Sequence, residues 1–128
     1  MADPKRRILV AEDDPAIRSM EERILAASGY QVVAVSNGAD ALARAKDDGP
    51  FDLFLFDVMM PGLSGFDLAR ELQRADATRA TPILFATAKG EGDDMNEGFG
   101  AGASLYLVKP FTTATLLAMV RAALATPG

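Results

Sequence analysis

The chain has 128 residues, of which 49% are hydrophobic, and it contains neither cysteine nor histidine. Thiol nucleophiles, disulfides, thiolate metal sites and imidazole acid–base chemistry are therefore excluded, so carboxylates, lysines and hydroxyls must supply any reactivity. The net charge of −5 argues against direct binding to a nucleic-acid backbone, and no apolar run approaches the roughly 18 residues that a membrane-spanning helix needs.

Short β-rich runs alternate with helical patterns along the whole chain, which is typical of a parallel sheet with helices on both faces. The first pair is Arg7–Glu12 followed by a helix that starts near Pro15 and stops before Gly29. Asn37-Gly38 is predicted to be the turn before the second helix. The expected strands span 7–12, 30–35, 51–57, 82–87 and 104–108; the expected helices span 15–28, 39–46, 65–74, 89–102 and a final stretch capped by Thr112 or Thr113.

The predicted fourth helix is the weakest element. Residues 89–102 include five glycines, and each costs up to about 1 kcal/mol relative to alanine in a helix, so we expect a short, mobile helix there. The opening residues lack the apolar stretch of a secretory signal. We expect one cytoplasmic domain over residues 1–128, with a polar N-terminal tail at 1–6 and a C-terminal tail at 125–128.

The segment Phe51–Gly62 (FDLFLFDVMMPG) is an apolar run that ends at a single carboxylate, Asp57. A strand this apolar belongs inside a sheet that is covered on both faces. Pro61-Gly62 then turns the chain, which places Asp57 at the carboxyl edge, where open α/β sheets keep their reactive groups. Asp57 is therefore the leading candidate for a functional residue.

Polar residues also follow three other predicted strands. They are Glu12-Asp13-Asp14, Thr87-Ala88 and Lys109-Pro110. Carboxylates from neighbouring strands supply the oxygen ligands that Mg²⁺ prefers, and a lysine opposite them favours a phosphoryl group. We expect Asp57 to be an ionised nucleophile that forms an aspartyl phosphate, with the Thr87 hydroxyl and the Ala88 N–H donating to phosphoryl oxygens. Asp14, just before a proline, is expected to be a turn former or helix cap.

A resemblance to a known family rests on four motifs that are separated along the chain: ILVAEDD, FDLFLFDVMMPGLSG, ILFATA and YLVKPF. The chain resembles the receiver domain of two-component response regulators over nearly its whole length, and especially the stand-alone chemotaxis regulator type. The resemblance implies a flavodoxin-like, doubly wound α/β fold with a five-stranded parallel sheet of order 2-1-3-4-5 and five helices.

The resemblance also implies roles for individual residues. Asp57 would be the phosphoacceptor and Asp13 a direct ligand of Mg²⁺, with Mn²⁺ as a substitute. Glu12 would act on the metal through a water, and the Met59 backbone carbonyl would reach it directly. The further implied residues are Thr87 as the switch hydroxyl, Tyr106 as the switch aromatic, Lys109 as the phosphate-pairing lysine, and a cis bond between Lys109 and Pro110.

As for partners, the resemblance implies a sensor histidine kinase or phosphotransfer protein as donor, and catalysis limited to the chain's own phosphorylation and dephosphorylation. An output protein would bind the face built by the glycine-rich helix, the Tyr106 strand and the last helix. No nucleic acid or membrane would be bound directly, and the domain would be a monomer or a weak, phosphorylation-dependent dimer.

The chain departs from many receiver domains at Met59 and Lys89, where polar and acidic or amide residues are common. We hypothesise that Met59 hinders the hydrolytic water and prolongs the life of the phosphoryl group. Three alternatives stay open: a receiver module of a larger transcription factor or hybrid kinase, an aspartate-nucleophile phosphatase, and a flavodoxin-like cofactor binder. Met59 cannot be the general acid that such a phosphatase needs, and Glu12-Asp13-Asp14 would repel a cofactor phosphate.

Overall fold

The structure, a computed structural model, describes residues 5–88 and 105–125. Its strands are β1 (Arg7–Ala11), β2 (Gln31–Val35), β3 (Leu53–Asp57), β4 (Ile83–Ala88) and β5 (Leu105–Lys109). Its helices are α1 (Pro15–Ala27), α2 (Gly38–Asp47), α3 (Gly65–Gln73), α4 (Asp76–Arg79) and α6 (Thr113–Ala125).

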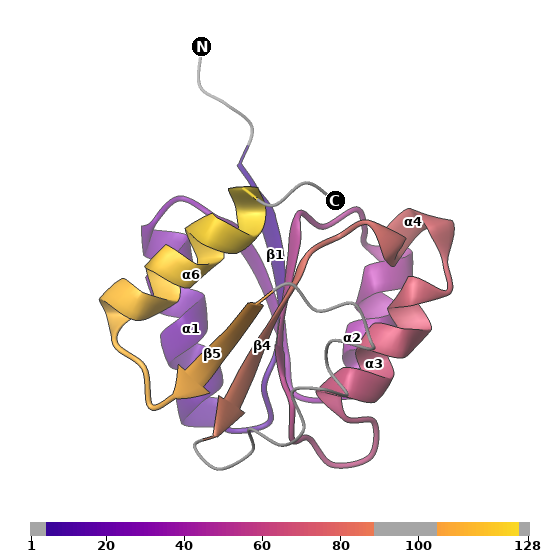
Figure 1. The fold of residues 1–128 in the computed structure, drawn as a ribbon, viewed down its shortest axis with the longest axis horizontal. Helices are drawn as coiled ribbons and strands as arrows, with labels where there is room; N and C mark the ends of the chain where they lie inside the picture. The colour runs from indigo at the N-terminus through magenta and orange to yellow at the C-terminus, as the bar shows by residue number, and fades with distance from the viewer. Residues whose placement is uncertain (1–4, 89–104, 126–128) are drawn as a thin grey trace.

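The five strands form one parallel sheet in the order β2-β1-β3-β4-β5. Helices α1 and α6 cover one face of this sheet, and α2 and α3 cover the other (Figure 1). This arrangement confirms the predicted doubly wound α/β fold and its strand order. None of the helices formed by the described residues is long and apolar enough to cross a bilayer.

Several element boundaries differ from the sequence prediction. Asn37 and Gly38 do not form a separate turn, because the Asn37 side chain accepts a hydrogen bond from the Asp40 N–H at 2.8 Å and caps α2. The short helix α4 has no counterpart in the prediction. The helix predicted within residues 89–102, and most of the two predicted tails, lie outside the described residues.

The uninterrupted apolar character of β3 follows from its central position, because all five of its residues are buried. Leu53 and Leu55 pack into the core on the α1 and α6 side, whereas Phe54 and Phe56 pack into the core on the α2 and α3 side. A strand that is covered on both faces needs apolar residues at every position. Asp57 is the first polar side chain at its end.

The start of α3 is packed directly against the end of β3. The Gly65 N–H donates a hydrogen bond to the Val58 carbonyl oxygen at 3.0 Å. A Cβ at position 65 would collide with the Asp57 carbonyl oxygen, so only glycine allows this approach. Ser64 caps α3 by accepting a hydrogen bond from the Asp67 N–H at 3.1 Å. The backbone around Asp57 is thus packed closely against the first turn of α3.

Candidate functional site

The predicted site residues meet at one edge of the sheet, where the parallel strands have their carboxyl ends. Glu12 and Asp13 follow β1 directly, and Asp57 is the last residue of β3. Thr87 is the penultimate residue of β4, and Lys109 is the last residue of β5. Segments that are far apart in the sequence therefore place three acids, a hydroxyl and an ammonium group along one edge.

The Lys109 ammonium group joins two buried acids. Its Nζ donates hydrogen bonds to Glu12 Oε1 at 2.7 Å and to Asp57 Oδ1 at 3.0 Å. Glu12 is only 1% exposed and Asp57 only 6%. Two carboxylates at this depth repel each other, so the shared cation offsets the cost of bringing both into the same site.

Burial is the main influence on the protonation of Asp57. Burial raises the pKa of Asp57, the Glu12 charge raises it further, and the hydrogen bond and charge of Lys109 lower it, which leaves a pKa of about 7. Burial by itself would lower the Lys109 pKa, but the hydrogen bonds to Glu12 and Asp57 raise it above its ordinary value. A divalent cation beside Asp57 would favour the ionised carboxylate.

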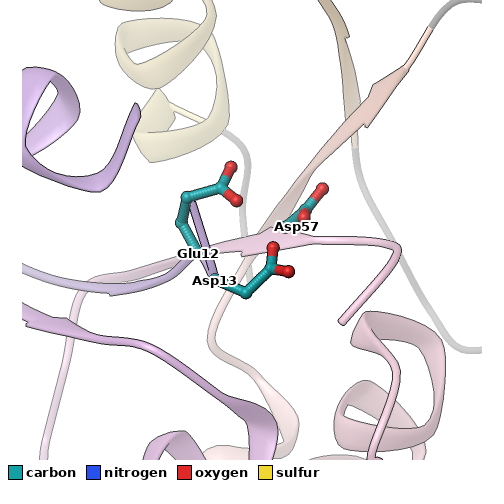
Figure 2. Close-up of side chains that lie close together, drawn as sticks. All are labelled: Glu12, Asp13 and Asp57. Carbon is teal, nitrogen blue, oxygen red and sulfur yellow. The ribbon is translucent and has the colours of Figure 1, made fainter. Parts of the chain in front are cut away.

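Glu12, Asp13 and Asp57 form a cluster of three carboxylates (Figure 2). One oxygen from each lies within 4.8 Å of the others. Opposite ligands of an octahedral Mg²⁺ are about 4.2 Å apart, so oxygens within this spread can surround one ion either directly or through a bound water. Asp13 is exposed, which leaves room for water and for an incoming phosphate. The donor set therefore fits a hard divalent cation.

The segment between β1 and α1 holds the first two acids in place. The Asp14 N–H donates to Glu12 Oε2 at 3.1 Å, and Arg18 donates to the Glu12 carbonyl oxygen at 2.9 Å. The Asp14 carboxylate accepts hydrogen bonds from the Ala16 and Ile17 N–H groups, so it caps α1. Its predicted role as a helix cap is confirmed, and Asp14 contributes no oxygen to the carboxylate cluster.

Thr87 and Tyr106 lie on the adjacent strands β4 and β5. Thr87 is 2% exposed, and its hydroxyl donates a long hydrogen bond to the Ala88 carbonyl oxygen at 3.4 Å. Tyr106 is half-buried, its ring centroid lies 5.7 Å from that of Phe85, and burial raises its pKa. The Lys109–Pro110 peptide bond is cis. The hydroxyl and the aromatic side chain are thus on paired strands beside the acids.

Met59 lies in the segment between β3 and α3. It is 58% exposed, which is unusual for a large apolar side chain. Because a thioether carries no acidic proton, the site has no general acid two residues after Asp57. This is unfavourable for the phosphatase alternative.

Glu21 and Gly65 were not identified from the sequence as important residues. Glu21 lies in α1, is 1% exposed, and neither carboxylate oxygen has a hydrogen-bond partner among the described residues. The sequence did contain a sign that Glu21 is buried, because it falls four residues after Ile17 and three before Ile24, on the apolar stripe of the helix. Gly65 had no comparable signal, since its contact with the Asp57 backbone depends on tertiary structure.

Comparison with known proteins gives one consistent family. Residues 8–121 match the family model of the response regulator receiver domain. The chain is 40% identical over 123 residues to the phosphate regulon transcriptional regulatory protein PhoB of Pseudomonas aeruginosa, a match that covers 96% of this chain and 53% of that protein. The chain thus spans about half the length of this curated relative.

Two solved structures have nearly the same fold. The chemotaxis response regulator CheY4 of Vibrio cholerae is 32% identical with a TM-score of 0.89, and the match covers 94% of this chain and 99% of that chain. The receiver domain of the sensor histidine kinase PA1611 from Pseudomonas aeruginosa PAO1 is 30% identical with a TM-score of 0.87. That match covers 96% of this chain and 100% of the other, whose structure has a magnesium ion coordinated in the active-site cleft.

Proposed function

The chain belongs to the response regulator receiver domain family, and on this premise we propose that Asp57 accepts a phosphoryl group from a phosphohistidine. The observation that carries the proposal is the pair of hydrogen bonds from Lys109 to Glu12 and Asp57, inside a cluster of three carboxylates. A sensor histidine kinase or a phosphotransfer protein would be the donor. The 128 residues contain no histidine, so the phosphohistidine must lie outside them.

The transfer exchanges one bond of phosphorus for another. An Asp57 carboxylate oxygen attacks phosphorus, the new P–O bond forms as the P–N bond of the donor breaks, and the imidazole leaves with the electron pair. Lys109, which already forms an ion pair with Asp57, would stay charged throughout and pair with the phosphoryl oxygens as they approach Asp57. Thr87 and the Ala88 N–H would donate to other phosphoryl oxygens. The chain's catalysis would be confined to its own phosphorylation and dephosphorylation.

The carboxylate cluster is proposed to hold Mg²⁺, with Mn²⁺ as a substitute. Asp13 and Asp57 would be direct ligands together with the Met59 backbone carbonyl, and Glu12 would act through a water. Glu12 suits the indirect role because Lys109 and the Asp14 N–H already occupy its two oxygens. When bound, the ion neutralises charge on the phosphoryl oxygens.

The response to phosphorylation is proposed to run through Thr87 and Tyr106. Movement of the Thr87 hydroxyl toward the phosphoryl group would open space for the Tyr106 ring to turn inward, shifting an equilibrium between two conformations. The output face would include β5 and α6, whereas the third expected element of that face, in residues 89–102, lies outside the described residues. The match to longer transcriptional regulators supports a DNA-binding output domain as one controlled partner.

The proposal is tested by incubating the protein with a small phosphodonor and Mg²⁺ and measuring the intact mass. The native protein is expected to gain one phosphoryl group, and the Asp57→Asn variant is expected to gain none. Asp47→Asn is the matched control, because Asp47 is an exposed acid in α2, and it should be phosphorylated like the native protein. Equal labelling of native protein and Asp57→Asn would overturn the assignment.

The metal is tested in the same assay. Chelation of Mg²⁺, or the Asp13→Asn substitution, is expected to slow labelling by at least about tenfold, since a factor of ten corresponds to only about 1.4 kcal/mol of lost stabilisation. Mn²⁺ is expected to restore labelling after chelation. Labelling that is insensitive to both changes would contradict the proposed metal site.

A further inference from the structure

Glu21 is a buried acid that the proposed mechanism does not use. It projects from the inner side of α1, four residues before the fully buried Leu25, and neither of its oxygens has a hydrogen-bond partner among the described residues. An ionised carboxylate without donors is strongly disfavoured at such a depth. Burial without donors therefore favours the protonated, neutral form of Glu21.

Three charged groups at the carboxyl edge of the sheet influence the ionisation of Glu21. Glu12 opposes ionisation of Glu21, Lys109 favours it, and Asp57 opposes it more weakly than Glu12 does. Together with burial, which is the largest influence, these charges raise the pKa of Glu21 to about 8. No hydrogen bond joins Glu21 to Glu12, Lys109 or Asp57, so the influence of these charges on Glu21 is electrostatic and acts through space.

The other elements around α1 contribute little charge. Among described residues, β2 and β4 carry no charged side chain. On α6 the only charged residue is Arg121, and on β1 it is Arg7 at the opposite end from the acids. Within α1 itself the charged neighbours of Glu21 are Arg18, Glu22 and Arg23, of which Arg18 is bonded to the Glu12 carbonyl oxygen.

We propose that Glu21 is a proton-binding residue coupled to the acidic site: it holds its proton more tightly while the carboxylate cluster is free of metal, and more weakly, with partial release to solvent, when a divalent cation joins the cluster. This inference rests on the metal site of the proposed function. Ile17, one helical turn before Glu21, lines a pocket of about 500 Å³ that Lys109 also lines, so this part of α1 lies beside the acidic site.

The reason is thermodynamic linkage. A divalent cation placed among Glu12, Asp13 and Asp57 offsets the negative charges that add to the effect of burial on Glu21, so the ion and the Glu21 proton compete. By reciprocity, removing the proton must strengthen ion binding by the same factor as the ion weakens proton binding. At the low end of typical coupling between sites this factor is about fivefold, which corresponds to a shift of about 0.7 in the titration midpoint of Glu21.

The test is a carbon NMR titration of the glutamate carboxyl groups, with and without Mg²⁺. The Glu21 signal is identified by its absence from Glu21→Gln. We expect its midpoint to fall by about 0.7 pH unit when Mg²⁺ is added. In parallel, the Mg²⁺ affinity of the native protein should rise about threefold more between pH 7 and pH 9 than that of Glu21→Gln, because this range covers most of the fivefold effect. Glu22→Gln, an exposed neighbour on the same helix, should behave like the native protein.

The outcomes of the Mg²⁺ titration distinguish the Glu21 coupling from the proposed metal site. Mg²⁺ binding with an unmoved Glu21 midpoint would overturn the coupling while leaving the proposed function intact. Failure of Mg²⁺ to bind the native protein at all would overturn both. If Glu21→Gln does not fold, Glu21→Met replaces it, because an apolar side chain of similar length suits this buried position. If the role of Glu21 were purely structural, adding Mg²⁺ would not move its titration midpoint.

Discussion

Lys109 Nζ lies 3.0 Å from Asp57 Oδ1, so the end of β5 supplies the cation that holds the acid at the end of β3. The two strands are not neighbours in the sheet, because β4 lies between them. The long lysine side chain crosses this gap and also reaches Glu12 after β1. The site therefore depends on one ammonium group for both its geometry and its charge balance.

Replacement of Lys109 by methionine is expected to destabilise the metal-free protein by about 2 kcal/mol at pH 8, because two buried acids lose their charged donor. The loss should be smaller at pH 6, where a carboxyl can take up a proton instead. Urea unfolding at the two pH values measures both effects. Lys46→Met is the control, because Lys46 is exposed on α2. A Lys109→Met loss no larger than that of the control would contradict the role given to this ion pair.

Replacement of Gly65 by alanine is expected to lower the free energy of unfolding by about 1 to 3 kcal/mol, because the new Cβ collides with the Asp57 carbonyl oxygen. This reverses the usual gain of alanine over glycine in a helix. Phosphorylation should also slow, since the strand end that carries Asp57 must shift. Thermal unfolding measures the change in stability, and intact mass measures phosphorylation. Ser19→Ala, at an exposed position of α1, is the control for the effect of alanine on helix stability. Unchanged stability in Gly65→Ala would show that the backbone yields without cost.

The stability of the metal-free protein is expected to fall as pH rises from about 5 to 8. The pKa of Glu21 is raised to about 8 in the folded protein from an ordinary value of 4.5. Between these pH values the folded protein therefore binds a proton that the unfolded protein has lost. The contribution of Glu21 is fully present below pH 4.5 and is lost as pH rises through 8. Asp57, with its pKa raised to about 7, acts in the same direction.

The Glu21 share of this pH dependence is isolated by substitution. Glu21→Gln should flatten the slope by up to about 1.4 kcal/mol per pH unit between pH 5.5 and 7.5, whereas Glu22→Gln should keep the native slope. Urea unfolding in the presence of a chelator, at half-unit pH intervals, gives the comparison. Identical slopes in native protein and Glu21→Gln would mean that Glu21 does not carry the proton.

Replacement of Met59 by asparagine is expected to shorten the lifetime of the phosphoryl group. The exposed Met59 side chain lies two residues after Asp57, where an apolar group hinders a hydrolytic water and an amide can orient one. An acceleration of about threefold to tenfold corresponds to roughly 1 kcal/mol of barrier. Loss of the added mass after removal of the phosphodonor measures the rate, and Met59→Leu should stay close to the native value. An unchanged dephosphorylation rate in Met59→Asn would contradict the hypothesis that Met59 slows hydrolysis of the phosphoryl group.

Much of the fold and the membership of the site could be predicted from local patterns. The apolar run that ends at Asp57 required a strand buried on both faces, and all five residues of β3 are buried. Because parallel strands share one carboxyl edge, the acids, Thr87 and Lys109 were expected together. The Asn37-Gly38 prediction failed because the pair is equally suited to a turn and to the start of a capped helix.

The sequence by itself determined the alternation of strands and helices, and the residue types that stand at strand ends, because these depend on spacing along a few neighbouring positions. Only the tertiary structure decided which of those residues pair. Lys109 and Glu12 are 97 positions apart, yet their side chains form a hydrogen bond of 2.7 Å. The collision that demands glycine at position 65 likewise arises only when distant segments are packed together, as does the burial of Glu21 without a hydrogen-bond partner among the described residues.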